Sequence, residues 1–83
     1  MYVEKVYDMV FKKMYDVLDR NGVVFIEDDY EEVAVRLVRN NGSLLSYIKR
    51  KGGSEIRTTT TSKMVFDTII SGKEISSHEY DKY

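Results

Sequence analysis

The sequence predicts an α+β protein in the order helix, strand, helix, an ambiguous segment, and a last helix. Apolar residues recur at three- and four-residue spacing through the first segment, which is the period of a helix. Residues 23–26 are instead a short apolar, β-branched run that is typical of strands. Glycines separate the segments. Gly22 and Gly42 each follow an asparagine, and Asn-Gly accepts the positive φ of helix ends and turns.

The first helix is the clearest element, because its apolar stripe keeps the helical period for about five turns. A hairpin of residues 14–19 and 23–28 is the alternative, but alternation in 14–19 is poor. Twelve of the first eighteen residues are apolar, more than one core-facing stripe requires. We therefore expect a homodimer through this helix. Its predicted interface is Val3, Val6, Tyr7, Val10, Phe11 and Met14.

A second helix is predicted after the strand. Asp28 or Asp29 would be its N-cap, and Glu31 or Glu32 would complete a capping box. Its end would fall at residues 40–42, Asn-Asn-Gly. Its buried stripe would be Tyr30, Val33, Ala34, Leu37 and Val38.

Residues 43–61 allow two interpretations. In the first, 44–49 and 55–61 form a hairpin, and the run of threonines at 58–61 favours the second strand. In the second, 43–51 is a short helix with Ser43 as its N-cap and Gly52 as its C′ residue. The segment is too short for the spacing of its apolar residues to distinguish a helix from a strand.

The last predicted helix begins after Thr61 or Ser62 and ends at Gly72. Its inward side would be Met64, Val65, Ile69 and Ile70. The length of 83 residues corresponds to one domain, which we place at residues 1–75. Residues 76–83 are polar, and they are predicted to be a frayed C-terminal tail.

Charge is sorted along the chain. Residues 1–35 hold four basic and nine acidic residues, residues 36–63 hold seven and one, and residues 64–83 hold two and four. A basic segment is what a polyanion binds, because phosphate neutralisation dominates nucleic-acid affinity. We therefore expect a small nucleic-acid-binding protein that uses residues 36–63, with regulation of transcription as one role that it could have. The candidate binding residues are Arg36, Arg39, Ser43, Ser46, Tyr47, Lys49, Arg50, Lys51, Arg57 and Lys63.

Residues 29–51 resemble a helix-turn-helix DNA-binding motif. Residues 31–37 have the Glu-Glu-Val-Ala-x-Arg-Leu pattern common in its first helix, with the small Ala34 at the crossing point. The resemblance implies a second helix at 43–51 that faces the major groove of DNA. The turn glycine, Gly42, comes about four residues later than is usual in the family. A winged helix-turn-helix is the alternative fold, with residues 55–61 beginning the wing.

Other classes of function have little support. The chain has no cysteine and one histidine, His78. The residues needed for a zinc site or for Cys–His catalysis are therefore missing. We expect no enzymatic activity, no cofactor, no metal and no small-molecule substrate. No apolar run approaches the ~20 residues that cross a membrane, and charges interrupt the first residues. An intracellular, cytoplasmic protein is expected.

The rival prediction is a protein–protein interaction module, such as an inhibitor or an assembly factor. In that case the basic segment would be only a solvated edge. The acidic first third of the chain would then be the contact surface.

Overall fold

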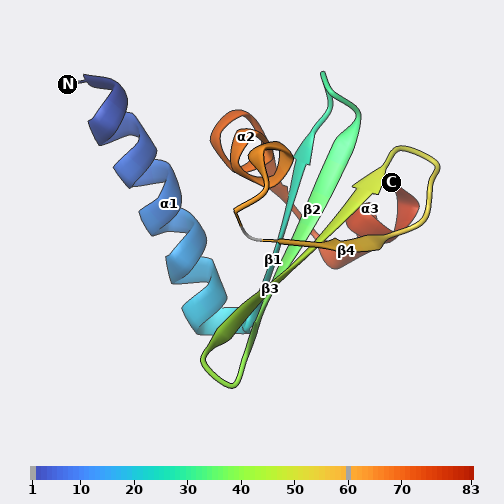
Figure 1. Ribbon diagram of the computed structural model, residues 1–83, viewed down its shortest axis with the longest axis horizontal. Coiled ribbons are helices and arrows are strands. Elements are labelled where there is room, and N and C mark those ends of the chain that lie inside the picture. The colour runs from blue at the N-terminus through green and yellow to red at the C-terminus, as the bar shows by residue number, and fades with distance from the viewer. Residues whose placement is uncertain (1, 60) are drawn as a thin grey trace.

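The computed structural model describes the backbone of residues 2–59 and 61–83, and the side chains of these residues from Met9 onward. The described part is an α+β fold with three helices and a five-stranded antiparallel sheet of order β4-β3-β2-β1-β5 (Figure 1). The elements are α1 (Tyr2–Asn21), β1 (Val23–Asp28), β2 (Val33–Asn40), β3 (Ser43–Arg50), β4 (Ile56–Thr58), α2 (Lys63–Ser71), β5 (Lys73–Ile75) and α3 (Ser77–Lys82).

The helices cover the two faces of the sheet unequally (Figure 1). Both α1 and α2 pack on one face and enclose the main core with it. The short helix α3 lies on the other face, where it buries a second, smaller cluster. The main core contains Met14, Val17, Leu18, Val24, Ile26, Val33, Val35, Leu37, Ile48, Val65 and Ile69. The second cluster contains Ala34, Ile75, Tyr80 and Tyr83.

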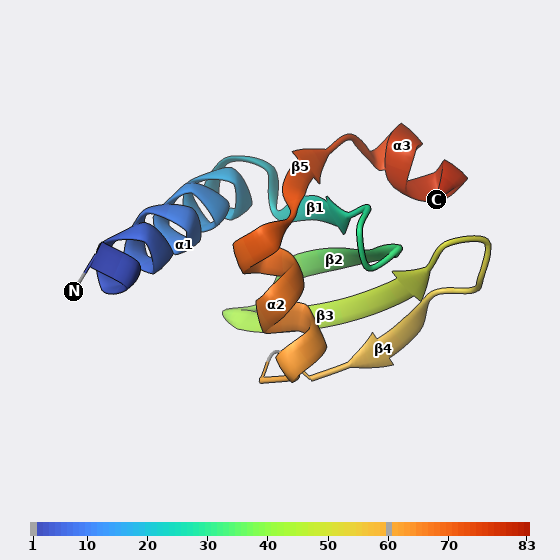
Figure 2. The same ribbon diagram turned by 90° about the horizontal axis from the view of Figure 1, so that it is seen from above.

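The sequence predicted α1 and β1 correctly. Helix α1 ends at the Asn-Gly pair, where Gly22 has a φ of 77° and its N–H donates to the carbonyl of Leu18 at 2.7 Å. The C-terminal half of α1 supplies Met14, Val17 and Leu18 to the core. Its first turns extend away from the sheet and from α2, as both views show (Figures 1 and 2).

The predicted second helix is wrong, because residues 33–40 form strand β2. Asp28 does not cap a helix. Its Oδ1 instead accepts hydrogen bonds from the backbone N–H groups of Tyr30 and Glu31, and closes the turn between β1 and β2. Pairing on both sides by β1 and β3 buries the continuous run at 33–35 on both faces of the sheet. An apolar run of this kind fits a buried strand as well as a helix.

The helix-turn-helix and its winged variant are also wrong, since residues 43–50 form strand β3 and pair with β2 in a hairpin. The pair Asn41-Gly42 is the two-residue hairpin turn, with φ of 51° and 80°. Positive φ at both positions is the requirement of a type I′ turn. The first interpretation of 43–61 was therefore correct in kind, although its second strand, β4, covers only Ile56–Thr58.

Helix α2 confirms the last predicted helix, with Val65 and Ile69 buried and Met64 exposed. It ends at Gly72, where a Cβ atom would lie 2.5 Å from the carbonyl oxygens of Glu27 and Thr68. That close approach requires glycine and leads the chain directly into β5.

Residues 76–83 are not a frayed tail. They form α3, whose N-terminus has a capping box between Ser76 and Glu79. Tyr80 and Tyr83 are buried against the sheet, so this segment is part of the domain. No helix within the described part of the chain is long and apolar enough to cross a membrane.

Candidate nucleic-acid interface

One cross-strand row lies on the face of the sheet opposite α1 and α2. Phe25 of β1 pairs with Arg36 of β2, Arg36 pairs with Tyr47 of β3, and Tyr47 pairs with Arg57 of β4. Paired residues in a sheet project to the same side. Their neighbours along the strands, Val24, Val35 and Ile48 among them, point into the main core. Aromatic and arginine side chains therefore alternate across four strands, and we call this set the aromatic–arginine row.

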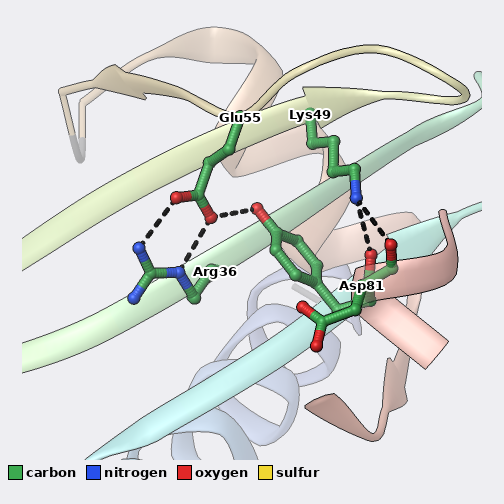
Figure 3. Close-up of polar contacts among 5 residues, drawn as sticks. Arg36, Lys49, Glu55 and Asp81 are labelled. Atoms are coloured by element: carbon green, nitrogen blue, oxygen red, sulfur yellow. Dashed lines mark hydrogen bonds and ion pairs between the residues drawn. The ribbon is translucent and has the colours of Figure 1, made fainter. Parts of the chain in front are cut away.

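Arg36 is held tightly in the middle of the row. Its Nε and Nη2 atoms donate to Oε2 and Oε1 of Glu55, both at 2.8 Å, in a bidentate ion pair (Figure 3). Its Cζ atom lies 4.1 Å from the centre of the Tyr47 ring, a cation–π contact. The pair stabilises both charged forms, so Glu55 raises the pKa of Arg36, and Arg36 lowers the pKa of Glu55.

Helix α3 covers the Phe25 end of the row. The rings of Tyr80 and Phe25 have centroids 5.1 Å apart. The Tyr80 hydroxyl donates to Glu55 Oε2 at 2.6 Å, and Lys49 Nζ donates to the carbonyls of Tyr80 and Asp81 at 3.0 and 3.2 Å (Figure 3). Burial, followed by the hydrogen bond to Glu55, raises the pKa of Tyr80. Glu55 thus connects the row to the helix that covers part of it.

The Arg57 end of the aromatic–arginine row is open. A second cross-strand row runs beside it, in which Val23 pairs with Val38, and Val38 pairs with Leu45. All three are only partly buried, as is Tyr47. The Arg57 side chain is exposed and has no hydrogen bond or ion pair to another described residue. We call this region the open half of the sheet. It consists of Val23, Arg36, Val38, Leu45, Tyr47 and Arg57.

The structure brings only some of the predicted binding residues together. Arg36, Tyr47 and Arg57 are adjacent on the open half. Lys49 lies on the same face, but α3 engages its ammonium group. Ser43 also belongs to this face by the alternation of β3, and it is exposed at the hairpin turn.

The remaining predicted residues lie elsewhere. Arg39 and Arg50 alternate to the helix-covered face, where Arg39 pairs with Asp19 at 3.1 Å and Arg50 Nη2 lies 3.9 Å from the sulfur of Met64. Ser46 is buried among core residues. Lys51 pairs with Asp29 at 3.8 Å, and Lys63 pairs with Asp67 at 2.8 Å. The basic segment of the sequence therefore does not form one continuous basic surface.

Sequence reasoning missed three residues of this region. Glu55 is the only acidic residue of the basic segment, and this was the one signal available for it. The sequence predicts a strand at Phe25 but not the face of the sheet on which Phe25 lies. It places Tyr80 in the polar tail, although Ser76 and Glu79 have the spacing of a capping box.

The predicted dimer interface overlaps the protein's own core. Met14 is buried in that core, and Val10 and Phe11 pack against it. Val3, Val6 and Tyr7 lie outside the described side chains. Exposed apolar residues do occur nearby on the helical layer, at Met9 and Phe66.

Within the described residues, no group of three or more His, Cys, Asp or Glu side chains is arranged to hold a metal ion. Comparisons with protein-family models, with curated proteins and with solved structures find no match to this chain. The open half of the sheet is therefore interpreted from its own geometry.

Proposed function

We propose that this protein binds single-stranded nucleic acid on the open half of its sheet and has no enzymatic activity of its own. One observation supports the proposal above the others: Arg36, Tyr47 and Arg57 are side by side on a sheet face that α1 and α2 leave uncovered. An exposed sheet face with aromatic and basic side chains is a common platform for single strands.

Side chains of the open half have separate roles in such a complex. A base stacks against the ring of Tyr47. Each such stack contributes about 1–3 kcal/mol to the free energy of binding. Arg57 supplies a positive charge that has no acidic partner among the described residues, and so it binds a phosphate. Val38 and Leu45 provide an apolar surface next to the ring, against which sugars and base edges pack.

A single strand fits this surface better than a duplex does. Bases in a duplex are stacked on one another, so their faces are hidden from Tyr47. The predicted major-groove helix is a strand. The hairpin of β2 and β3 is also flanked by β1 and β4. Five strands span about 19 Å at the usual spacing, whereas the major groove is about 12 Å wide.

Fluorescence anisotropy with short labelled oligonucleotides at low salt tests the proposal. Wild type should bind a single strand more tightly than the matching duplex. Tyr47→Ala should weaken binding by about 5- to 150-fold, the equivalent of one lost base stack. Arg57→Ala should flatten the slope of log K against log salt by about 0.7.

Tyr30→Ala is the matched control, because Tyr30 is 92% exposed and belongs to the turn between β1 and β2. It should leave affinity unchanged. Failure of wild type to bind single strands at low salt would contradict the proposal. So would equal losses in Tyr47→Ala and Tyr30→Ala, or a preference for the duplex.

A protein partner is the second candidate, and the row of Val23, Val38 and Leu45 favours it. These partly buried residues adjoin Tyr47 and Arg57, and tyrosine and arginine are enriched in the centres of protein interfaces. Such a contact would depend weakly on salt. A nucleic-acid complex would weaken steeply as salt rises.

A further inference from the structure

We propose that Glu55 occupies the place of a nucleic-acid phosphate at Arg36 and thereby sets the affinity of the open half of the sheet. This inference rests on the proposed function. Glu55 would be an internal competitor that the incoming strand displaces from the Arg36 guanidinium.

The geometry of the pair is the first argument. An arginine binds a carboxylate and a phosphate in the same way, through two parallel N–H···O bonds. Arg36 makes both bonds to Glu55, at 2.8 Å each (Figure 3). The guanidinium group is also fixed over the Tyr47 ring. A phosphate that replaced the carboxylate would therefore lie beside the ring on which a base stacks.

The position of Glu55 is the second argument. Its side chain is 30% exposed. Glu55 lies in the connection between β3 and β4, shortly after Gly52 and Gly53, and does not belong to a strand. Moving this carboxylate therefore breaks no pairing between strands. A solvent-accessible carboxylate is also released into water at low cost, unlike a buried one.

The contact with α3 is the third argument. Glu55 also accepts the hydrogen bond from the Tyr80 hydroxyl, at 2.6 Å. When a phosphate binds Arg36, Glu55 still accepts the hydrogen bond from the Tyr80 hydroxyl and stays exposed to solvent. The exchange leaves neither group without a hydrogen-bond partner, so the pair is suited to reversible opening.

The exchange has a consequence that can be measured. In wild type, the phosphate at Arg36 replaces a carboxylate, so one favourable ion pair is lost for each one gained. Without the carboxylate, Arg36 offers a second full phosphate contact beside Arg57. The protein should then bind a single strand more tightly and release more counterions.

Glu55→Gln tests the inference, because glutamine keeps an acceptor for Tyr80 but removes the charge. In the anisotropy assay, Glu55→Gln should bind a single strand about fivefold more tightly at low salt, the equivalent of one exposed ion pair. The salt slope should steepen by about 0.7. Arg36→Ala in the Glu55→Gln background should abolish both gains.

Two controls distinguish this effect from a change in the net charge of the protein and from loosening of α3. Glu74→Gln makes the same charge change at an exposed residue of β5, whose register with Ile26 places it on the other face. Tyr80→Phe removes the hydroxyl that holds Glu55 to α3 but keeps the Arg36 pair. Neither control should steepen the salt slope.

The results distinguish this inference from the proposed function. If wild type binds single strands while Glu55→Gln matches wild type or Glu74→Gln in affinity and slope, the inference is overturned and the proposed function stands. If no variant binds at low salt, both fall. Thermal unfolding followed by circular dichroism confirms that each variant is folded.

Discussion

At the scale of single residues, Ser46 is a polar side chain inside an apolar core. It is 1% exposed, and its hydroxyl has no hydrogen-bond partner among the described residues. A buried polar group without a partner costs about 1–3 kcal/mol. Ser46→Ala should therefore raise the free energy of unfolding, by about 1 kcal/mol.

Urea denaturation measures this change. Ser43→Ala is the matched control, because Ser43 is exposed at the start of the same strand. The control should shift stability by less than about 0.5 kcal/mol. A Ser46→Ala variant less stable than wild type would show that the hydroxyl has a favourable interaction in the folded protein.

The arginines of the sheet show how strongly the surroundings decide the role of a residue. Arg36, Arg39 and Arg57 have the same charge in the sequence. In the structure, Arg36 pairs with Glu55, Arg39 pairs with Asp19, and Arg57 has no acidic partner among the described residues. The register of the strands, the connection between β3 and β4 and the position of α1 decide which of them is available to a ligand.

At the scale of elements, two buried tyrosines hold α3 to the sheet. This attachment should weaken at alkaline pH. Burial, followed by the nearby Asp29 carboxylate, raises the pKa of Tyr83 to about 12 from its ordinary value of 10.0. Burial and Glu55 raise the pKa of Tyr80 in the same direction. The folded state therefore favours the neutral phenols.

The sign of the pH effect follows from linkage. A group whose pKa is raised on folding contributes its full stability below the unfolded value and loses it as pH rises through the folded value. The free energy of unfolding should fall between about pH 10 and pH 12, measured by urea denaturation. Tyr83→Phe should flatten this fall. Tyr30→Phe should not, since Tyr30 is exposed; equal pH profiles for the two variants would contradict the argument.

The hairpin of β2 and β3 shows that local signals were present but allowed two structures. Asn41-Gly42 fits a helix end and a type I′ turn equally well. The run at 33–38 likewise fits a helical stripe and a strand buried on both faces. Its two neighbours in the sheet, β1 and β3, decide for the strand because they pair the backbone groups of β2 along both edges.

At the scale of the whole molecule, the charge segregation of the sequence is partly cancelled in space. Acidic residues of the first third of the chain meet the basic segment at Asp19–Arg39 and Asp29–Lys51. The packing of α1 on the sheet and the turn between β1 and β2 bring these residues together, although they are about twenty positions apart in the chain. Nucleic-acid binding is therefore proposed for a small surface around Arg57, and not for the whole of residues 36–63.

Self-association through α1 stays a prediction at this scale. The first turns of α1 extend beyond the sheet (Figures 1 and 2). Met9 is 70% exposed, and Phe66, which contacts Phe11, is 41% exposed. We expect light scattering at micromolar concentration to give twice the chain mass of 9.7 kDa.

A charge placed in the contact should shift that mass. Met9→Glu should lower it, because an interface buries charge only at a cost. Ile56→Glu is the matched control, since Ile56 is also an exposed apolar residue but lies on β4, away from α1. A wild-type mass of one chain would rule the dimer out. A dimer unaffected by Met9→Glu would place the contact elsewhere.

Elements whose signals are local can be predicted from the sequence. The period of α1 and the β-branched run of β1 depend on neighbours within a few residues, and the glycine that ends α2 can be read directly from the sequence. Three features depend on the tertiary structure: residues 33–50 form a hairpin, α3 packs on the sheet, and Arg57 has no acidic partner in the part of the chain whose side chains are described. These outcomes depend on hydrogen bonds and ion pairs between segments far apart in the chain. Periodicity and charge along one segment do not contain that information, because a strand takes its partners and its exposed face from the rest of the sheet.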